Sequence, residues 1–452
     1  MTIPEFTKAA KGKKAEILGL GVSNLPLIDF LLSCGMRVCA RDRKSREELG
    51  NTAADLEGKG VTLITGDNYL DGIDGDYVFR SPGIRPDVAQ IAAAVRKGAI
   101  LTSEMELFFD LCPARTVAVT GSDGKTTTTT LISLLLKEAG YRVRCGGNIG
   151  TPLLPFVKEM TEADFAVLEL SSFQLMTMRK SAEIAVLTNL SPNHLDWHKG
   201  MEEYIQAKTN IFSHPENRIV VINADNAPSN ALALPPDSEI RYFSSEKAQI
   251  PGMYEKDGDV FLDGKRVLKK DGVLLPGRHN KQNYMAAYSA VRDFVSPECL
   301  ARVAATFKGV EHRLEFVREY RGVRIYNSSI DSSPSRTAAA LSCFKDKVNI
   351  ICGGYDKHIP FAPLADALCT HAKNVVLTGA TAPAIQKALD ECPAKEKPRV
   401  LHRPLFEDAV HTAVGISVPG DVLLLSPACA SFDAFKNFMV RGETFKKIIN
   451  EL

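Results

Sequence analysis

The chain has 452 residues, which is long for a single hydrophobic core, so we expect two or three domains. Hydrophobic residues make up 45% and charged residues 24%, the proportions of an ordinary globular protein. Lys and Arg number 55 and Asp and Glu 54, so the charge balance indicates neither a nucleic-acid surface nor a polybasic membrane patch.

The ten cysteines are scattered without a CxxC pair, and several, such as Cys39 and Cys352, stand inside apolar runs. Buried free thiols in a reducing cytosol explain this pattern better than disulfides or a zinc site. The N-terminal stretch is basic but has no sustained apolar run, and no segment reaches the ~18 apolar residues of a membrane span. We therefore expect a cytoplasmic protein.

Over the first 110 residues, short apolar runs alternate with segments of helical spacing. A helix is expected at 24–35, and strands are expected at 15–22, 36–42, 61–66 and 76–83. Strands that alternate with helices predict a parallel sheet with helices on its faces, here a Rossmann-like domain over residues 1–110.

A second strand–helix series begins at 115–140, and its further strands are expected at 165–172, 184–191 and 218–225. Each strand ends in polar residues, where the ligand sites of open α/β sheets gather. From about Arg241 to Leu275, paired strand patterns with Asp-Gly turns predict a small antiparallel insertion. This central domain is expected to cover residues 111–309.

A third series begins near Gly309, with strands expected at 323–329, 347–357, 374–380 and 420–431. It predicts a C-terminal Rossmann-like domain over residues 310–452. The fold class is thus α/β, with three tandem domains and ligand sites in the clefts between them.

The segment TGSDGKTT follows a predicted strand and opens a predicted helix. Gly124, Lys125 and Thr126 fit the Walker pattern, but Val119 replaces its first glycine and Gly121 lies inside the loop. Such a turn aims backbone N–H groups and the helix dipole at phosphate oxygens, while the lysine neutralises the β- and γ-phosphates and the threonine holds Mg²⁺. The alternative is a plain glycine turn before a Thr-rich helix, and the strand–loop–helix context favours the phosphate loop.

The shortened T-G-x-x-G-K-T/S loop resembles that of the Mur ligases and folylpolyglutamate synthetases, which join an amine to a carboxylate through an acyl phosphate. Further motifs of this family occur in the same order: GNIG (147–150), LELSSFQL (168–175), TNLSPNHLDWH (188–198), HNKQN (279–283), EHRLE (311–315), GGYDK (353–357) and LLSPACASFDAFKNFMVRG (424–442). They are spread over all three predicted domains. The resemblance implies a UDP-substrate domain, an ATP-binding P-loop domain and an amino-acid-binding domain, in that order.

Within the family, the last two motifs are typical of the enzymes that add D-glutamate, and the DNPR-type motif of the diaminopimelate- or lysine-adding enzymes is absent. The resemblance therefore implies ATP-dependent addition of D-glutamate to UDP-N-acetylmuramoyl-L-alanine in peptidoglycan synthesis, with release of ADP and phosphate. It also implies a monomer with small-molecule substrates and no nucleic-acid or membrane partner.

Other functions remain as alternatives. Within the ligases these are an L-alanine-adding Mur ligase and a folylpolyglutamate synthetase. Outside them, a P-loop phosphotransferase would stop at phosphorylation, and a non-catalytic UDP-sugar-binding protein would have no use for Lys125, Glu169 and His194 together.

The resemblance implies a catalytic group of Lys125, Glu169, His194 and Lys208. Mg²⁺, expected as two ions, would be held by Thr126, Glu169, His194 and a carbamate on Lys208, with Asp196 and His198 as weaker candidates. A lysine crowded by cations has a lowered pKa, and its neutral amine can capture CO₂. The alternative for Glu169 is a solvated or capping glutamate after a strand. The alternative for Lys208 is a solvated lysine on an amphipathic helix.

The resemblance assigns ATP contacts to the phosphate loop and to polar residues further along the chain: Gly121, Ser122, Asp123, Gly124, Lys125, Thr126, Thr127, Asn280, Asn283, Arg313 and Asp331. The asparagines could instead be helix caps. Ser328 stands where the family pattern N-D-S has a ribose-binding Asp, and Asp331 follows three residues later, so either Asp331 takes over or the contact is weaker.

The motif GLGVSN (19–24) has Asn24 in place of the third glycine of a dinucleotide fingerprint, and Asp42 follows about twenty residues on, as a ribose-binding acid would. A nicotinamide dehydrogenase is the alternative for this domain alone, but it leaves the phosphate loop without a purpose. The resemblance instead assigns UDP-substrate contacts to Val22, Ser23, Asp42, Arg43, Lys44, Ser81 and Asn148. It assigns D-glutamate contacts to Ser332, Lys357, Ser431 and the backbone of Phe438.

Overall fold

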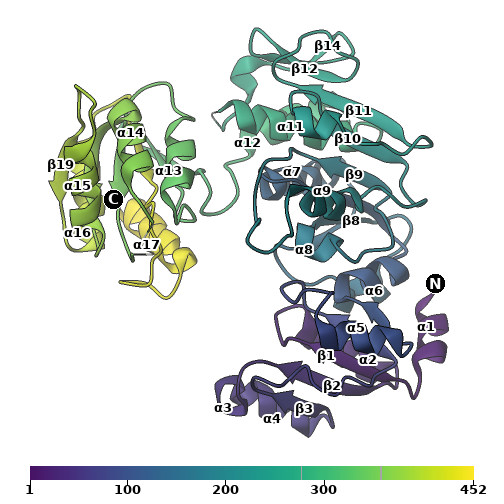
Figure 1. Cartoon of the computed structure of the whole chain (residues 1–452). Coiled ribbons are helices and arrows are strands. Elements are labelled where there is room, and N and C mark those ends of the chain that lie inside the picture. Colours follow the sequence, from purple (N-terminus) through teal and green to yellow (C-terminus); the bar gives the residue numbers. More distant parts are fainter. Residues whose placement is uncertain (276, 357–358) are drawn as a thin grey trace. The chain divides into compact units, whose positions relative to one another are not determined.

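The computed structural model describes residues 1–275, 277–356 and 359–452, and it contains three β-sheets of five, nine and six strands (Figure 1). The chain divides into two compact units. The first comprises Met1–Lys270 with Gln282–Val303, and the second Asp271–Lys281 with Ala304–Leu452. The first unit holds the two N-terminal sheets and the second holds the six-stranded sheet, which confirms the predicted α/β fold class.

The first sheet has the order β3-β2-β1-β4-β5, and all of its strands are parallel. The strands are β1 (Lys14–Leu18), β2 (Arg37–Asp42), β3 (Thr62–Thr65), β4 (Tyr77–Arg80) and β5 (Ile100–Thr102). The helices are α1 (Ile3–Ala10), α2 (Asn24–Ser33), α3 (Arg46–Leu49), α4 (Asn51–Gly58), α5 (Ala89–Arg96) and α6 (Glu104–Leu111). The strand order reverses beside β1, so the carboxyl ends of β1 and β4 flank the crevice where such sheets bind ligands.

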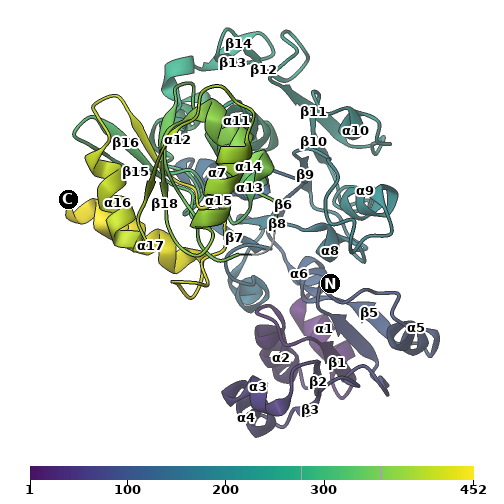
Figure 2. The same ribbon diagram turned by 60° about the vertical axis from the view of Figure 1, so that its left-hand side comes forward.

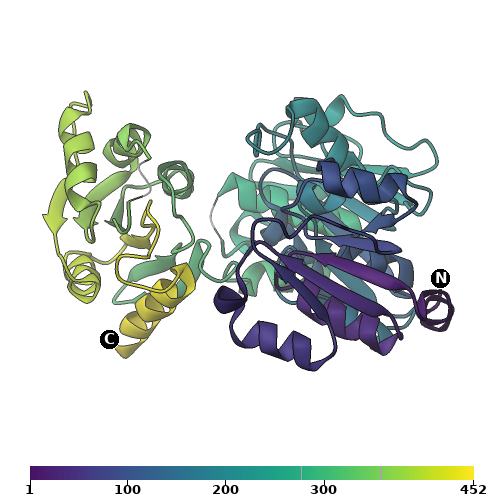
Figure 3. The same cartoon turned by 60° about the horizontal axis from the view of Figure 1, so that its bottom comes forward.

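Helices cover both faces of this sheet, and strands β1 and β2 are buried along most of their length (Figure 3). Helices α1, α2 and α4 pack on one face through residues such as Phe6, Leu31 and Leu56. Helix α5 packs on the other face, where Ile91 joins Leu18 in a separate cluster.

The central sheet has the order β14-β13-β12-β11-β10-β9-β6-β8-β7. Its strands are β6 (Arg115–Thr120), β7 (Val143–Gly147), β8 (Phe165–Glu169), β9 (Ile184–Leu187), β10 (Ile219–Asn223), β11 (Glu239–Ser244), β12 (Met253–Lys256), β13 (Asp259–Leu262) and β14 (Lys265–Leu268). The helical segments are α7 (Lys125–Glu138), η1 (Leu154–Glu159), α8 (Ser172–Leu175), α9 (Met201–Thr209), α10 (Ala227–Asn230), η2 (Lys270–Gly272), α11 (Arg278–Val291) and α12 (Pro297–Thr306). Strand β6, which precedes the phosphate loop, lies between β8 and β9.

The antiparallel insertion is smaller than the sequence predicted. Strands β12, β13 and β14 pair antiparallel through Asp-Gly turns, and both residues of each turn have the positive φ that such hairpins need. Strand β11, however, pairs parallel with β10 and with β12, so the prediction was wrong for this strand. The reason is that β11 follows a crossover through α10 and is not the arm of a hairpin.

The third sheet has the order β15-β16-β20-β17-β18-β19 and is parallel except for β15, which pairs antiparallel with β16. Its strands are β15 (Glu315–Tyr320), β16 (Val323–Asn327), β17 (Val348–Cys352), β18 (Ala372–Leu377), β19 (Arg399–His402) and β20 (Val422–Leu425). Helices α13 (Pro334–Leu341), α14 (Ala362–His371) and α15 (Ala382–Glu391) pack on one face, and α16 (Phe406–Gly415) and α17 (Phe438–Glu451) on the other (Figure 2).

One apolar core joins the two sheets of the first unit, because α2 and α6 of the first sheet pack on η1 of the central domain. Phe108 of α6 and Leu154 of η1 are fully buried in it. All ten cysteines are free thiols, as predicted. Among the described residues, no helix combines the length and apolar character that a bilayer crossing requires.

Candidate active site

The predicted strand–loop–helix turn is present between β6 and α7, and α7 begins at Lys125. Gly121 and Gly124 have φ of 147° and 78°, a region that side chains disfavour. A Cβ on Gly121 would overlap Thr188 Oγ1, and one on Gly124 would lie 2.6 Å from Asn283 Oδ1. Both the backbone conformation and the close neighbours therefore require glycine at these two positions.

Polar residues that follow β9 hold the loop in this shape. Thr188 Oγ1 donates to Asp123 O at 2.6 Å, and Asp123 N donates to Asn189 Oδ1 at 2.9 Å. Ser122 Oγ donates to Ser191 O at 2.9 Å. Hydrogen bonds within the protein thus hold the loop in this conformation, so its backbone N–H groups need little rearrangement to bind an anion.

Two lysines meet at one carbonyl of this loop. Lys125 Nζ donates to Gly121 O at 3.0 Å and to Ser122 O at 2.9 Å. Lys208 Nζ, from α9, donates to the same Gly121 O at 2.8 Å and to Thr120 Oγ1 at 3.2 Å. Burial, and then the charge of Lys125, lowers the pKa of Lys208 well below its usual value, while Glu169 and Asp123 oppose the shift. The site therefore favours a neutral amine on Lys208 beside its phosphate loop.

Glu169 is the last residue of β8 and is only 2% exposed. Its Oε1 accepts a hydrogen bond from Asn148 Nδ2 at 2.8 Å, and its backbone oxygen accepts one from Asn148 N at 2.8 Å. Its Oε2 is buried without a hydrogen-bond partner among the residues that the structure describes. A buried carboxylate oxygen without a donor is well suited to a cation.

His194 lies on the loop between β9 and α9, exposed and with a positive φ of 54°. Its ring centre lies 4.9 Å from that of Phe173, which follows β8. Partial burial lowers the pKa of His194, with Lys125 and Lys208 acting in the same direction and Asp196 against it. The imidazole is thus favoured in its neutral form, the form that binds metals.

The two weaker metal candidates differ in their surroundings. Asp196 is exposed, on the same loop as His194. His198 is buried, and its Nε2 shares a hydrogen bond of 2.9 Å with Ser172 Oγ, so this nitrogen is already occupied.

Within the described ranges, no group of three or more His, Cys, Asp and Glu side chains is close enough to hold a metal ion by itself. Mg²⁺ commonly takes one or two protein carboxylates and completes its shell with water and substrate phosphates. Glu169 Oε2, which has no hydrogen-bond partner among the described residues, and the hydroxyl of Thr126 at the start of α7 are oxygen ligands of the kind that such a shared site needs. The residues therefore fit a Mg²⁺ ion that arrives with a nucleotide.

Asn283, on α11, is also brought to the phosphate loop. Its Oδ1 accepts a hydrogen bond from Thr128 Oγ1 at 3.2 Å, and it faces Gly124. Thr127 is buried at the start of α7, and Asn280 lies in the first turn of α11. The adenine-side role of the two asparagines stays a prediction.

All of the predicted UDP-substrate contacts except Asn148 gather at the carboxyl edge of the first sheet. Asp42, at the end of β2, accepts hydrogen bonds from Leu20 N at 2.6 Å and Lys44 N at 2.9 Å. Ser81 follows β4, and its side chain lies against Gly19. Asn24, in the place of the third fingerprint glycine, donates to Gly19 O at 2.7 Å. The same edge also carries Val22, Ser23 and Arg43, and Val22 is 77% exposed.

In the second unit, the predicted residues follow β16 and β20, which are neighbours in the sheet. Asp331 is buried, its carboxylate accepts a hydrogen bond from Ser426 Oγ at 2.8 Å, and burial raises its pKa. Ser328 Oγ accepts one from Leu314 N at 3.1 Å. Ser431 is buried, and Ser332 is half-buried.

Arg441, on α17, links the two loops of the second unit, and the sequence reasoning missed it. Its guanidinium donates to Ser329 O at 2.9 Å and to Cys429 O and Ala430 O at 3.0 Å each. Ser329 Oγ in turn donates to Phe438 O at 2.8 Å. The signal was present in the motif FKNFMVRG, but nothing in the sequence shows that its arginine is buried.

Arg313 lies half-buried at the start of the second unit, just before β15. Lys357, a predicted D-glutamate contact, lies outside the described residues.

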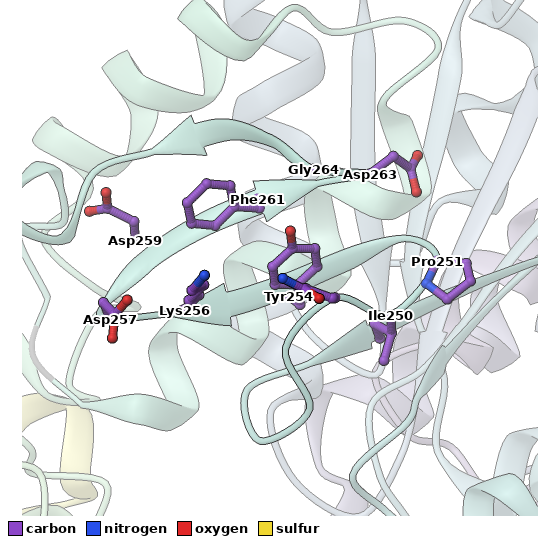
Figure 4. A pocket seen from close by; sticks show the side chains of 10 residues that line it. Ile250, Pro251, Tyr254, Lys256, Asp257, Asp259, Phe261, Asp263 and Gly264 are labelled. Carbon is purple, nitrogen blue, oxygen red and sulfur yellow. The ribbon is translucent and has the colours of Figure 1, made fainter.

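A cavity of about 610 Å³, open to the surface, lies on the β12–β13 hairpin (Figure 4). Tyr254 and Phe261, from neighbouring strands, stack at its wall with ring centres 5.4 Å apart. No phosphate-loop residue lines this cavity, so it does not belong to the candidate site.

Comparison with known proteins agrees with these features. Residues 119–291 match the Mur ligase middle domain, and residues 312–429 match the Mur ligase glutamate ligase domain. A UDP-N-acetylmuramoylalanine–D-glutamate ligase of Clostridium botulinum is 48% identical over 99% of both chains. Proteins of the same name from Clostridium novyi and Ruminiclostridium cellulolyticum are 47% and 45% identical, over 100% of this chain and 99% of each relative.

Solved structures support the fold. The UDP-N-acetylmuramate–alanine ligase of Thermotoga maritima superposes with a TM-score of 0.60 at 18% identity, covering 97% of this chain and 99% of the other. A UDP-N-acetylmuramoyl-L-alanyl-D-glutamate–2,6-diaminopimelate ligase gives 0.59 at 19% identity, covering 92% and 93%. Taken with the full-length relatives, these matches show that the chain belongs to the Mur ligase family.

Proposed function

We propose that this protein joins the carboxylate of UDP-N-acetylmuramoyl-L-alanine to the amine of D-glutamate, with hydrolysis of ATP to ADP and phosphate, in peptidoglycan precursor synthesis. The observation that carries the proposal is the meeting of Lys125, Lys208 and Glu169 around one braced phosphate loop. Full-length relatives at 45–48% identity bear the name of this ligase, which supports the choice of substrates.

A carboxylate reacts with an amine only after its oxygen becomes a good leaving group. Transfer of the ATP γ-phosphoryl group gives an acyl phosphate, and attack by the amine then gives a tetrahedral intermediate that expels phosphate. The first step brings two anions together, so positive charge must be fixed where they meet. In this proposal, Lys125 and the loop N–H groups would hold the transferring phosphate.

Mg²⁺, which this family uses together with ATP, supplies charge neutralisation at the phosphates and holds them in line. Thr126, Glu169 and His194 are the residues that would hold it, and we expect two ions. The neutral amine of Lys208 would add CO₂ and lose a proton to give a carbamate anion. The carbamate anion would become a further Mg²⁺ ligand or would orient one. A carbamate on Lys208 would also give a reason for a buried lysine beside a second lysine.

The remaining predicted contacts complete the proposal. Asp42 and Ser81 would bind the UDP moiety, and Asn148 would contact the carboxylate-bearing substrate. Ser332, Lys357, Ser431 and the backbone of Phe438 would bind D-glutamate, and Arg313 and Asp331 would contact ATP. We expect a monomer that works in the cytoplasm.

A substrate panel tests the proposal. The purified protein is incubated with UDP-N-acetylmuramoyl-L-alanine, ATP and Mg²⁺, and with D-glutamate, L-glutamate, L-alanine or L-lysine in separate reactions. Mass spectrometry should detect the new amide with D-glutamate, together with an equal amount of ADP. A product with another amino acid instead, or ADP release without any amide, would contradict it.

A further inference from the structure

The segment 80–85, which we call the arginine loop, connects β4 to the region before α5 and carries Ser81. It contacts the central domain at both ends and in the middle. At one end, Arg80 donates to Phe173 O, which follows β8, at 2.8 Å. In the middle, Trp197 Nε1 donates to Gly83 O at 3.2 Å. At the other end lies Arg85.

Arg85 makes the most contacts across this junction. Its guanidinium donates to Trp197 O at 2.6 Å and to both carboxylate oxygens of Glu203, at 2.9 and 3.1 Å. It also lies 4.9 Å from the centre of the Trp197 ring. On its own side, it donates to Asp87 at 2.8 and 3.0 Å. The side chain is 20% exposed, so these charges are partly shielded from water.

The partners of Arg85 belong to the elements that carry the proposed metal ligands. Trp197 lies three residues after His194, on the same loop, and Glu203 lies on α9, the helix of Lys208. Glu203 also accepts a hydrogen bond from Lys199 N at 2.8 Å and lies 3.4 Å from His198 Nδ1.

His198 extends these contacts to α8, the helix that follows the strand of Glu169. Its Nε2 is hydrogen-bonded to Ser172 Oγ at 2.9 Å, three residues beyond Glu169, and its ring lies parallel to that of Phe173 at 5.6 Å. The arginine loop is therefore connected to α8 (which follows β8), to the His194 loop and to α9 at once. An isolated surface ion pair would not reach all three elements.

We propose that Arg85 is a positioning residue that couples the UDP-substrate site to the metal-binding loop. This rests on the proposed function. Substrate bound beside Ser81 fixes the arginine loop, and Arg85 then holds Trp197 and Glu203, and through them the His194 loop and α9, in one arrangement. Because coupling between two sites is reciprocal, Mg²⁺ with nucleotide must also tighten binding of the UDP substrate.

Trp197 is the only tryptophan of the chain, so its fluorescence reports on this junction directly. UDP-N-acetylmuramoyl-L-alanine should change the emission of the wild-type protein. In Arg85→Ala, calorimetry should still detect binding of this substrate, but the emission change at saturation should be lost. Arg85→Lys should keep part of it, because one cation remains beside Glu203.

Kinetics should separate coupling from a general loss of structure. In Arg85→Ala and in Glu203→Gln, the KM for the UDP substrate and the Mg²⁺ concentration for half-maximal rate should both rise about fivefold or more. The KM for D-glutamate should stay within about twofold, a change too small to indicate lost coupling. Arg142→Ala is the matched control, because Arg142 makes a similar bidentate pair with Asp164 inside the central domain. It should leave all these constants unchanged, and circular dichroism should be the same for every variant.

The proposal is overturned if Arg85→Ala keeps the wild-type emission change, the wild-type KM for the UDP substrate and the wild-type Mg²⁺ concentration for half-maximal rate. It is also overturned if the wild-type protein does not bind the UDP substrate. Failure of the proposed function looks different. In that case the wild-type protein would bind the UDP substrate and its Trp197 emission would change, and Arg85→Ala would lose that change. No amide with D-glutamate would form, however.

Discussion

The first unit contains two glycine turns at the carboxyl ends of parallel strands, one after β1 and one after β6, and the side chains beside them carry opposite charges. After β1, the Asp42 carboxylate accepts from the backbone at Leu20, and Asn24 fills the place of a glycine. After β6, the lysines Lys125 and Lys208 converge on Gly121 O.

The backbone framework is shared, and the side chains around it decide what it binds. A carboxylate at a strand end suits hydroxyl and N–H groups of a ribose or a base, whereas two lysines and helix N–H groups suit phosphates. If this is correct, substitutions in one turn should affect one substrate and leave the other unchanged.

The largest effect is expected for Lys125→Ala. The variant should lose kcat by about a hundredfold or more, because the transferring phosphate loses its nearest cation. Phosphate release in a coupled assay measures it, with Lys137→Ala at the other end of α7 as the control. A variant that kept about a tenth of the wild-type rate would show that the loop does not bind the phosphates in this way.

Lys208→Ala should be nearly as inactive, because the carbamate and its negative charge disappear. A short carboxylate such as acetate or formate should partly restore the rate, whereas it should not help Lys125→Ala. Mass analysis of the wild type in bicarbonate should find one added CO₂ on Lys208. Full activity of Lys208→Ala would exclude the carbamate.

Asp42→Asn should act on the other turn. It removes the charge from the hydrogen bonds to Leu20 N and Lys44 N and weakens the contact with the UDP moiety. The KM for UDP-N-acetylmuramoyl-L-alanine should rise about tenfold while the KM for ATP stays constant. A rise in the KM for ATP would remove the distinction between the two turns.

A smaller effect is expected for Asp331→Ala. If Asp331 replaces the ribose-binding acid that is missing at Ser328, the KM for ATP should rise severalfold and the KM for D-glutamate should not. Because Asp331 also bonds Ser426, thermal melting must accompany the kinetics. A selective rise in the KM for D-glutamate would move this loop to the amino-acid site.

The last variant should leave activity unchanged and alter stability only. Glu104, on α6 where the two sheets of the first unit join, is buried, and burial raises its pKa from 4.5 to about 7. Between these pH values the folded protein holds a proton that the unfolded chain has lost, so the free energy of unfolding falls as pH rises. Glu104→Gln should avoid this loss.

Chemical denaturation at pH 4 and pH 8 should therefore give a difference between variant and wild type only at pH 8. A rise in pKa of this size corresponds to at most about 3 kcal/mol. Equal stabilisation at both pH values would mean that the effect comes from packing and not from the charge of Glu104.

Local patterns predicted most of the strands and the phosphate turn, because apolar runs and glycine spacing are local properties. Strands β5, β7, β15 and β19 were missed, since they are short or half-exposed. The parallel pairing of β11 depends on its crossover connection, which a strand pattern does not contain.

For the candidate site, too, local motifs could be predicted from the sequence and contacts between distant segments could not. Lys125 and Glu169 were identified from motifs, but the reason that Lys208 differs from an ordinary helix lysine is its burial beside Lys125, which only the fold shows. Arg85 and Glu203 are 118 residues apart, and neither belongs to a recognisable motif. Contacts between distant segments arise from the packing of the two domains and leave no spacing signal.

The central claim is that ATP activates the carboxylate of the UDP substrate as an acyl phosphate at the loop after β6. UDP-N-acetylmuramoyl-L-alanine with ¹⁸O in its terminal carboxylate tests it directly, because the activated oxygen must leave with phosphate. Mass analysis should find one ¹⁸O in the inorganic phosphate for each amide formed with D-glutamate. Inorganic phosphate without ¹⁸O, formed together with the amide, would contradict the account.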